Sequence, residues 1–376
     1  MAAMTADDRS ALIVLQQLPG VGPATIRRLV DRFGGYVAAL ERATSDEIGD
    51  RAVAARRSKR VWSRAERVIA TLAALRIEMI VESDERYPTR LRHLDQPPHV
   101  LYARGDLTIA ERPCVAVVGA RHHTQYGADV TRDLAAGLAR AGAVVVSGLA
   151  RGIDGIAHRA TLDSGGTTIA VLGSGCDVPY PHDHETLLRE VAETGLVLTE
   201  FLPGEPPRRG HFPRRNRLIA ALSLGVVVVE AGVRSGSLIT VGHALELGRE
   251  VFAVPGPVTR NTSAGTNALV RDGATVVLGV EDVIEGLRRA GANVGEPVAR
   301  TAAVRRESAT ATTQTAPHDM GEFPTRVLAA LSTEPRSAEA IAGESSLDPG
   351  TTLSALLELE LGGFARQLPG FRFVRA

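Results

Sequence analysis

Apolar residues change their spacing near residue 114, and this change predicts two kinds of structure. Before it, residues 1–72 place leucine, isoleucine and valine at helical intervals on both sides of a break at Leu18–Pro23. After it, short continuous apolar runs alternate with helix-like segments, as expected for strands buried on both faces of a sheet. These runs are Val115–Val118, Ala143–Ser147, Thr168–Leu172, Leu196–Glu200, Val226–Glu230, Val251–Val254 and Thr275–Leu278. The alternation predicts an α/β fold with a Rossmann-like, doubly wound, mostly parallel sheet.

Four helices are expected between these strands, at Val130–Ala141, His184–Glu193, Arg217–Leu222 and Ser237–Leu247. Residues 73–112 form a connector in which Ile77–Val81 has the pattern of a strand. Tyr87-Pro88 and Pro97-Pro98 predict turns in the same connector, because proline fixes the backbone and removes a hydrogen-bond donor.

The chain divides by composition into four predicted parts. These are a helical, helix-hairpin-helix or SAM-like domain (1–72), the Rossmann-like domain with its connector (73–288), a linker rich in Ala, Thr, Gly and Arg (289–320) and a terminal domain (321–376). Three short helical patterns and a hairpin-like end predict a winged helix for the last part. Its candidate recognition helix, Pro349–Leu361, carries Glu358 and Glu360 and no basic residue, so we expect packing or a protein contact rather than a DNA groove.

Composition narrows the class of protein. The chain is 44% hydrophobic and 4% aromatic, which is typical of a soluble globular protein. No apolar run reaches the length of a membrane span, and Met1–Ser10 lacks the order of a signal peptide, so a cytoplasmic protein without membrane contact is expected. The net charge of zero indicates no polyanion partner by itself. Cys114 and Cys176 are expected to be small buried residues, since neither lies in a zinc-binding spacing.

Glycine-rich loops follow four of the predicted strands. The segments are Gly119-Ala120-Arg121, Gly148-Leu149-Ala150-Arg151, Gly173-Ser174-Gly175 and Gly232-Val233-Arg234-Ser235-Gly236. In an open parallel sheet the carboxyl ends of strands form the ligand crevice, and backbone amides with helix N-termini there favour an anion. Glycine also makes simple tight turns, but four such loops at one sheet edge favour an anion-binding site.

A second cluster contributes positive charge before the fifth strand: Arg208, Arg209, His211, Arg214, Arg215, Asn216 and Arg217. Phe212-Pro213 fixes the backbone here, and a helix is expected to begin near Arg217. Five arginines with Asn216 have the capacity to neutralise several phosphates, although arginine runs are also common on solvated surfaces. Tyr126, Tyr180 and Phe212 are candidates either for stacking on unpaired bases or for packing.

Several small-ligand chemistries are disfavoured. The loop after the first strand lacks the GxGxxG pattern, and Lys59, the only lysine, lies in no Walker sequence. Adjacent residues in His182–Glu185 cannot easily converge on one ion, so we expect a helix cap at Asp183 and no metal. Asp154 and His158 are expected to brace a helix start rather than to act as an acid–base pair. We therefore expect no catalytic residues and no cofactor.

The Leu18-Pro19-Gly20-Val21-Gly22-Pro23 segment has the pattern of a helix-hairpin-helix motif. Such a hairpin meets a phosphate through its backbone amides and a helix N-terminus. A tight turn between two packed helices is the alternative interpretation.

The ordered motifs between residues 115 and 280 resemble the DprA (Smf) family of DNA-processing proteins. They are Val117–Arg121, Tyr126-Gly127, Ser147–Asp154, Ala157-His158, Ala170–Gly175, Tyr180-Pro181, Phe212–Arg217, Ser235–Thr240, Val254–Gly256, Gly265–Asn267 and Asp272–Ala274. Ala120, where the family usually has serine, and His122 and His123 depart from the pattern.

The resemblance implies a non-enzymatic recombination mediator of natural transformation. Such a protein is a homodimer that binds single-stranded DNA, protects incoming DNA and loads RecA recombinase. The expected DNA-binding residues are Gly119, Arg121, Gly148, Arg151, Phe212, Arg214, Arg215, Asn216, Arg217, Gly232, Ser235 and Gly236. The alternative is an enzyme similar to nucleotide phosphoribohydrolases, but their Pro-Gly-Gly-x-Gly-Thr loop with following glutamates is absent from Glu230–Gly236.

Overall fold

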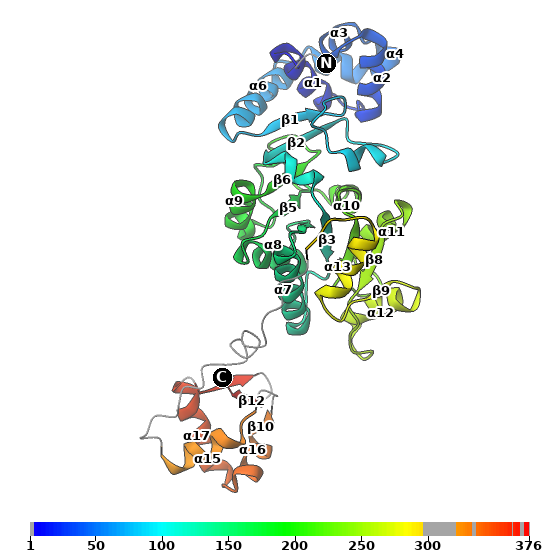
Figure 1. The fold of residues 1–376 in the computed structure, drawn as a ribbon. Helices are drawn as coiled ribbons and strands as arrows, with labels where there is room; N and C mark the ends of the chain where they lie inside the picture. The colour runs from blue at the N-terminus through cyan, green and yellow to red at the C-terminus, as the bar shows by residue number, and fades with distance from the viewer. Residues whose placement is uncertain (1–3, 296–320, 333–335, 363, 369–371, 376) are drawn as a thin grey trace. The chain divides into compact units, whose positions relative to one another are not determined.

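The computed structural model describes residues 4–295, 321–332, 336–362, 364–368 and 372–375 (Figure 1). It divides into two compact units, Met1–Val298 and Ala299–Ala376. Residues 296–320, which make up most of the predicted linker, lie outside the described residues.

The first unit begins with helices, as predicted. They are α1 (Ala6–Gln17), α2 (Pro23–Phe33), α3 (Tyr36–Arg42), α4 (Ser45–Ile48), α5 (Asp50–Arg56) and α6 (Lys59–Ala74). Leu12, Leu15 and Leu29 are fully buried between them. Gly20 adopts φ +80° in the turn between α1 and α2, a conformation that favours glycine.

A nine-stranded sheet forms the centre of the unit. Its strands are β1 (Glu78–Val81), β2 (Val100–Gly105), β3 (Cys114–Val118), β4 (Val144–Ser147), β5 (Thr168–Val171), β6 (Leu196–Thr199), β7 (Gly225–Val228), β8 (Glu250–Ala253) and β9 (Thr275–Val276). The order is β1-β2-β6-β5-β4-β3-β7-β8-β9. The seven predicted strands of the domain pair in parallel, whereas β1 and β2 extend the sheet antiparallel to β6.

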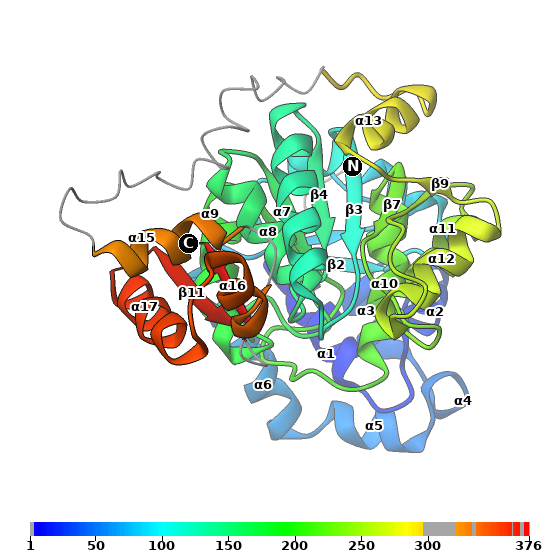
Figure 2. The ribbon, with the colours of Figure 1, turned by 90° about the horizontal axis from the view of Figure 1, so that it is seen from below.

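Helices cover both faces of this sheet, which confirms the doubly wound fold (Figure 2). They are α7 (Gln125–Arg140), α8 (Ile153–Asp163), α9 (Glu185–Thr194), α10 (His211–Leu222), α11 (Ser237–Glu246), α12 (Ala264–Arg271) and α13 (Val280–Arg289). Alternate residues of β3 show the two layers. Cys114 and Ala116 pack with residues of α10 and α11, and Val115 and Val117 pack with residues of α7, α8 and α13.

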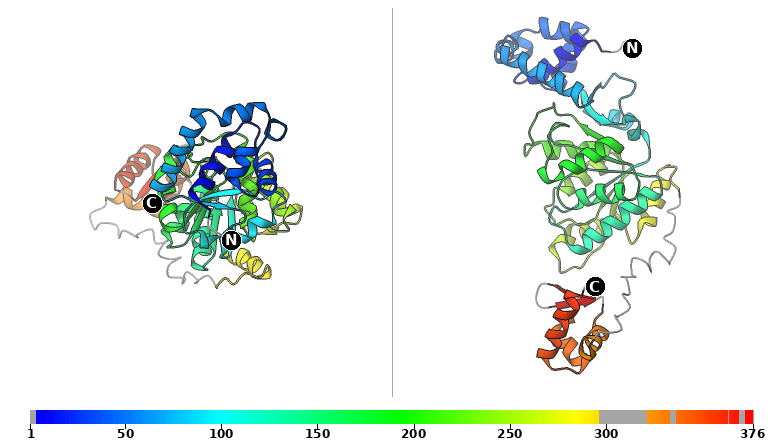
Figure 3. Two further views of the ribbon diagram at one scale, coloured as in Figure 1. Left: turned by 90° about the horizontal axis from the view of Figure 1, so that it is seen from above. Right: turned by 90° about the vertical axis from the view of Figure 1, so that its left-hand side faces the viewer.

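The N-terminal helices pack at the β1–β2 edge of the sheet (Figure 3). One buried cluster contains Leu12 and Leu15 of α1 together with Tyr102 of β2. The Tyr102 hydroxyl also donates to Gln16 Oε1 at 2.6 Å. The helical domain and the sheet therefore share a core.

The structure corrects one predicted helix boundary and adds one strand to the nine-stranded sheet. Helix α10 begins at His211, six residues before the predicted start near Arg217, because Pro213 lies in the first turn, where a missing N–H costs nothing. Strand β2 was not predicted and forms where residues 100–105 pair with β1 and β6.

The second unit has the winged-helix architecture predicted for it. Helices α15 (Glu322–Ala330), α16 (Ala338–Ser345) and α17 (Pro349–Leu361) accompany the strands β10 (Arg336–Ser337), β11 (Ala365–Leu368) and β12 (Arg372–Arg375). The strand order is β10-β12-β11, and β10 was not predicted.

Both cysteines are fully buried, as expected, and burial raises the pKa of the Cys114 thiol to about 12. Among the described residues, no helix combines the length and the apolar character needed to cross a membrane.

Candidate nucleic-acid interface

A cavity of about 360 Å³ lies at the carboxyl ends of β3 and β7. From β3 the chain continues to β4 on one side, and from β7 it continues to β8 on the other side. The ends of β3 and β7 therefore form the switch point at which open α/β sheets bind ligands. The lining comes from the loops after β3, β4 and β7 and from the first turns of α10 and α11. The residues are Val118, Gly119, Arg121, Ala150, Asp154, Phe212, Pro213, Arg215, Asn216, Ile219, Ser235, Gly236, Ser237, Ile239 and Thr240.

Arg121 and Phe212 form the cationic and aromatic part of this cavity. The Arg121 guanidinium lies 5.4 Å from the centroid of the Phe212 ring, and the Arg121 side chain is exposed. Phe212 in turn contacts Tyr180, with ring centroids 5.4 Å apart. Tyr180 is exposed and Phe212 is half-buried, so a cation beside this aromatic pair offers both a phosphate contact and a surface for a base.

The α10 and α11 sides of the cavity are polar. Asn216 Nδ2 donates to the Gly236 carbonyl oxygen at 3.3 Å, and the Ser235 and Ser237 hydroxyls lie 2.7 Å apart. Helix α11 begins at Ser237, and its first turn, Ser237-Leu238-Ile239-Thr240, has no carboxylate. The partial positive charge of this helix start therefore faces the cavity without a compensating side chain.

Arg215 lies in the interior, which differs from the solvent-facing phosphate contact predicted for it. It is 4% exposed, and its Nη1 donates to the carbonyl oxygens of Gly148, at 2.7 Å, and of Val171. Burial lowers the Arg215 pKa to about 10. Gly148 is required at its position, because a Cβ there would lie 2.3 Å from Arg215 Nη1.

Asp154 is the buried counterpart of Arg215. Its Oδ2 accepts the Gly148 N–H at 3.1 Å. Burial raises the pKa of this carboxyl, and the nearby Arg215 charge acts in the opposite direction. Asp154 therefore holds the loop after β4, whereas His158 bonds to Thr168 Oγ1 at 2.7 Å. The two residues bond to different partners.

Arg214 and Arg217 point away from this cavity. Both donate from Nη2 to Glu200 Oε2 at 2.7 Å, and Arg217 also donates to the Gln96 carbonyl oxygen at 2.8 Å. Since α10 is helical from His211, residues 214 and 217 share one face, whereas Phe212, Asn216 and Ile219 share another. Arg214 and Arg217, two of the residues expected to bind DNA, therefore do not line this cavity.

The remaining predicted residues surround the cavity or lie beside it. Gly119 lines it and packs tightly, since a Cβ there would lie 2.7 Å from Ile153 Cγ1. Arg151 is exposed and pairs with Asp183 at 3.1 Å. Gly232 is outside the lining and accepts the Ser235 N–H at 2.9 Å.

The predicted cap at Asp183 is wrong, because Asp183 is used by Arg151 and α9 has His184 as its N-cap. In the described part of the chain, no group of three or more His, Cys, Asp or Glu side chains could hold a metal ion.

Glu230 is a site residue that the sequence reasoning missed. It is 2% exposed at the end of β7 and accepts both the N–H and the hydroxyl of Thr124, at 2.8 and 2.6 Å. These bonds hold the loop that carries Arg121 against β7. No local pattern marks a glutamate as the partner of a threonine 106 residues away.

Comparison with known proteins gives two family matches. Residues 78–288 match the family model described as DNA recombination-mediator protein A, and residues 310–370 match the DprA winged helix domain. A DNA processing protein DprA of Bacillus subtilis is 38% identical over 260 residues, which cover 69% of this chain and 87% of that protein.

Two solved structures are similar. DprA from Streptococcus pneumoniae matches with a TM-score of 0.60 and 34% identity, over 75% of this chain and 98% of that chain. DNA processing protein A from Helicobacter pylori, described as having a unique single-stranded DNA binding mode, matches with a TM-score of 0.52 and 33% identity, over 57% of this chain and 97% of that chain. The chain belongs to the DprA/Smf family of DNA-processing proteins.

Proposed function

We propose that this protein binds single-stranded DNA at the cavity between the ends of β3 and β7. The observation that carries the proposal is Arg121, an exposed cation on the Phe212 ring at the ligand crevice of the sheet. The single-stranded DNA binding mode described for the Helicobacter pylori relative supports it.

The chemistry of the cavity fits a strand of unpaired nucleotides. Arg121 and the start of α11 attract phosphate, and Phe212 with Tyr180 offers ring faces to bases. Every base has a ring face, so this arrangement binds without strong sequence preference.

The proposal includes the cellular role of the family. The protein would be a homodimeric, cytoplasmic recombination mediator that protects incoming DNA and loads RecA recombinase in natural transformation, without chemistry of its own. A RecA ATPase assay on single-stranded DNA coated with a single-strand-binding protein tests the loading step, and adenine release from AMP would contradict the non-enzymatic part.

A salt titration tests the DNA site. Fluorescence anisotropy with labelled oligo-dT compares wild type, Arg121→Ala and the control Arg140→Ala, whose exposed arginine ends α7 at the opposite edge of the sheet. We expect Arg121→Ala to weaken binding and to reduce the slope of log K against log salt by about 0.7 for one lost phosphate contact. Equal affinity and slope in both variants would exclude the proposed site.

A further inference from the structure

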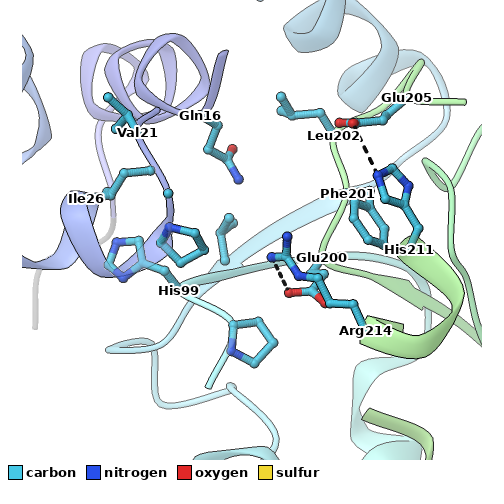
Figure 4. A pocket seen from close by; sticks show the side chains of 14 residues that line it. Gln16, Val21, Ile26, His99, Glu200, Phe201, Leu202, Glu205, His211 and Arg214 are labelled. Atoms are coloured by element: carbon cyan, nitrogen blue, oxygen red, sulfur yellow. Dashed lines mark hydrogen bonds and ion pairs between the residues drawn. The ribbon is translucent and has the colours of Figure 1, made fainter. Parts of the chain in front are cut away.

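A second depression lies where the N-terminal hairpin meets the sheet domain. Two cavities of about 200 and 800 Å³ share Gly22, Pro23, Pro98, Glu200 and Arg214, and we call them together the hairpin cleft. Figure 4 shows the smaller cavity, with Val21 and Ile26 on one side and Arg214 and His211 of α10 on the other. Arg121 and Phe212 line neither of these cavities, so the cleft is distinct from the site proposed above.

The hairpin side of the cleft offers backbone donors. Gly20, Gly22, Ala24 and Thr25 line it, and the first amides of a helix have no acceptor within the helix. The first turn of α2, Pro23-Ala24-Thr25-Ile26, contains no carboxylate that would compensate the helix dipole. No heavy atom of the described residues lies within 4 Å of where a Cβ on Gly22 would be, so the hairpin opens onto free space.

Arg214 supplies a cation on the opposite side. Glu200 holds it through Nη2, and its guanidinium lies 5.3 Å from the Phe201 ring centroid. The side chain is nevertheless 44% exposed, whereas that of Arg217 is 19% exposed and bonds to both Glu200 and Gln96. Arg214 is thus fixed in place with part of its guanidinium accessible to a ligand.

The floor of the cleft contains buried polar atoms that lack a hydrogen-bond partner among the described residues, and Glu200 Oε1 is an acceptor among them. The Glu200 side chain is 2% exposed, and its Oε1 has no hydrogen-bond partner among the described residues. His99 Nδ1, which also borders the smaller cavity, likewise has none there. Burial lowers the His99 pKa to about 4, so the ring is neutral near pH 7. A buried carboxylate oxygen such as Glu200 Oε1 is stabilised by a hydrogen bond, and here a ligand N–H group would have to donate it.

The charges of the larger cavity balance. Arg27, Arg214 and Arg217 face Asp95, Glu200 and Glu246 among its lining residues. A bare phosphate gains little net attraction in such a cleft. A ligand with a phosphate at one end and N–H groups at the other satisfies both sides, and a nucleotide has this composition.

We propose that the hairpin cleft binds one nucleotide, with its phosphate at Arg214 and the amides of Gly22, Ala24 and Thr25, and with a base N–H at Glu200 Oε1. The nucleotide belongs either to the DNA strand of the proposed function, which then has a second anchor, or to a free mononucleotide. The predicted phosphate contact of the helix-hairpin-helix motif would be made here.

Gly22 allows a test in which the fold is preserved. It is the N-cap of α2 with φ −100° and ψ 177°, a conformation open to any residue, and both aspartate and asparagine are preferred at N-caps. Gly22→Asp and Gly22→Asn should therefore fold equally well, and only aspartate places a negative charge where the phosphate would lie.

The experiment has two arms, one for a DNA strand and one for a free nucleotide. In the strand arm, a long oligo-dT is titrated at several salt concentrations into wild type, Gly22→Asp, Gly22→Asn and Arg121→Ala. Either new side chain can cap the Ala24 and Thr25 amides, so we expect both variants to bind more weakly than wild type. Because only aspartate adds a negative charge, we expect Gly22→Asp to bind roughly eightfold more weakly than Gly22→Asn at about 50 mM NaCl, with a slope reduced by about 0.7 relative to Gly22→Asn. In the free-nucleotide arm, saturation-transfer NMR compares dTMP, thymidine and inorganic phosphate. A free-nucleotide site predicts that dTMP gives the strongest signal and that Gly22→Asp abolishes it.

The outcomes separate the two proposals. A loss in Arg121→Ala with no difference between Gly22→Asp and Gly22→Asn, in either arm, would overturn the hairpin cleft and leave the proposed function intact. A protein that binds no oligo-dT would overturn the proposed function, and the dTMP arm would then decide for or against the cleft alone.

Discussion

Arg215 donates a hydrogen bond from Nη1 to the carbonyl oxygen of Gly148 at 2.7 Å, in the buried wall of the cavity. The same nitrogen bonds to the Val171 carbonyl oxygen at the end of β5. One arginine of the most basic segment therefore joins α10 to the ends of two strands, and the buried carboxyl group of Asp154 lies close to it.

Replacing Arg215 by methionine should destabilise the fold. The variant removes the cation beside the buried Asp154 and leaves two carbonyl oxygens without a donor, so we expect the free energy of unfolding to fall by about 3 kcal/mol. Urea denaturation measures this. Arg209→Met, at an exposed arginine of the same segment, is the control and should change stability little.

The Arg215→Met variant also tests whether Arg215 is a buried structural residue or contacts a phosphate of the bound DNA. Where Arg215→Met still folds, its salt slope for oligo-dT binding should equal that of wild type, even if the affinity is lower. A slope shallower by about 0.7 would mean that Arg215 contacts phosphate directly and that its buried position does not persist in the complex.

Replacing Phe212 by leucine should weaken DNA binding in a different manner from Arg121→Ala. The leucine keeps apolar bulk but loses the ring face, so we expect a loss of about 1 kcal/mol in binding free energy with an unchanged salt slope. Phe323→Leu, at a half-exposed phenylalanine of α15, is the matched control. A Phe212→Leu protein with wild-type affinity would show that the ring contributes neither to base stacking nor to the position of Arg121.

The parallel sheet was predictable from sequence because its central strands, β3 to β7, are buried on both faces and therefore form continuous apolar runs. Strand β2 was not, because residues 100–105 owe their extended form to antiparallel pairing on both sides, with β1 and β6. Pairing of this kind depends on residues far away in the chain.

The site was predictable in its location but not in the orientation of its arginines. Glycine loops at strand ends correctly indicated the cavity that Gly119 and Gly236 now line. A helix start near Arg217 places Pro213 before the helix, whereas the structure has Pro213 in the first turn of α10, where a proline fits. Starting α10 at His211 turns Arg214 toward Glu200 and Arg215 into the core, and only the fold reveals those partners.

Replacing Glu230 by alanine should loosen the loop that carries Arg121. The variant removes the acceptor of both Thr124 donors, which fix the start of α7. We expect a lower melting temperature and weaker oligo-dT binding, with faster hydrogen exchange at residues 121–127. Glu193→Ala, at an exposed glutamate near the end of α9 that lines none of the cavities described above, controls for loss of charge. Unchanged exchange in the loop would contradict the bracing role.

His158 should make the stability of the protein depend on pH. Thr168 Oγ1 donates to the Val145 carbonyl oxygen at 2.6 Å, so it accepts its second bond from His158 Nδ1–H, and the buried ring is neutral. Burial lowers the folded-state pKa of His158 from 6.5 to about 3. Between these values the unfolded chain binds a proton that the folded protein does not. The contribution of His158 to stability is therefore complete above pH 6.5 and is lost as the pH falls toward 3, by up to about 1.4 kcal/mol per pH unit.

Urea denaturation at several pH values between these limits checks this in wild type and in His158→Asn, which keeps an N–H donor near Thr168. The variant should show a shallower fall in unfolding free energy on acidification, whatever its absolute stability. His99, whose pKa burial lowers to about 4, contributes in the same direction and should retain part of the slope in His158→Asn. His93→Asn, at an exposed histidine, serves as the control, and a slope in His158→Asn identical to that of His93→Asn would show that His158 does not remain neutral in the folded protein.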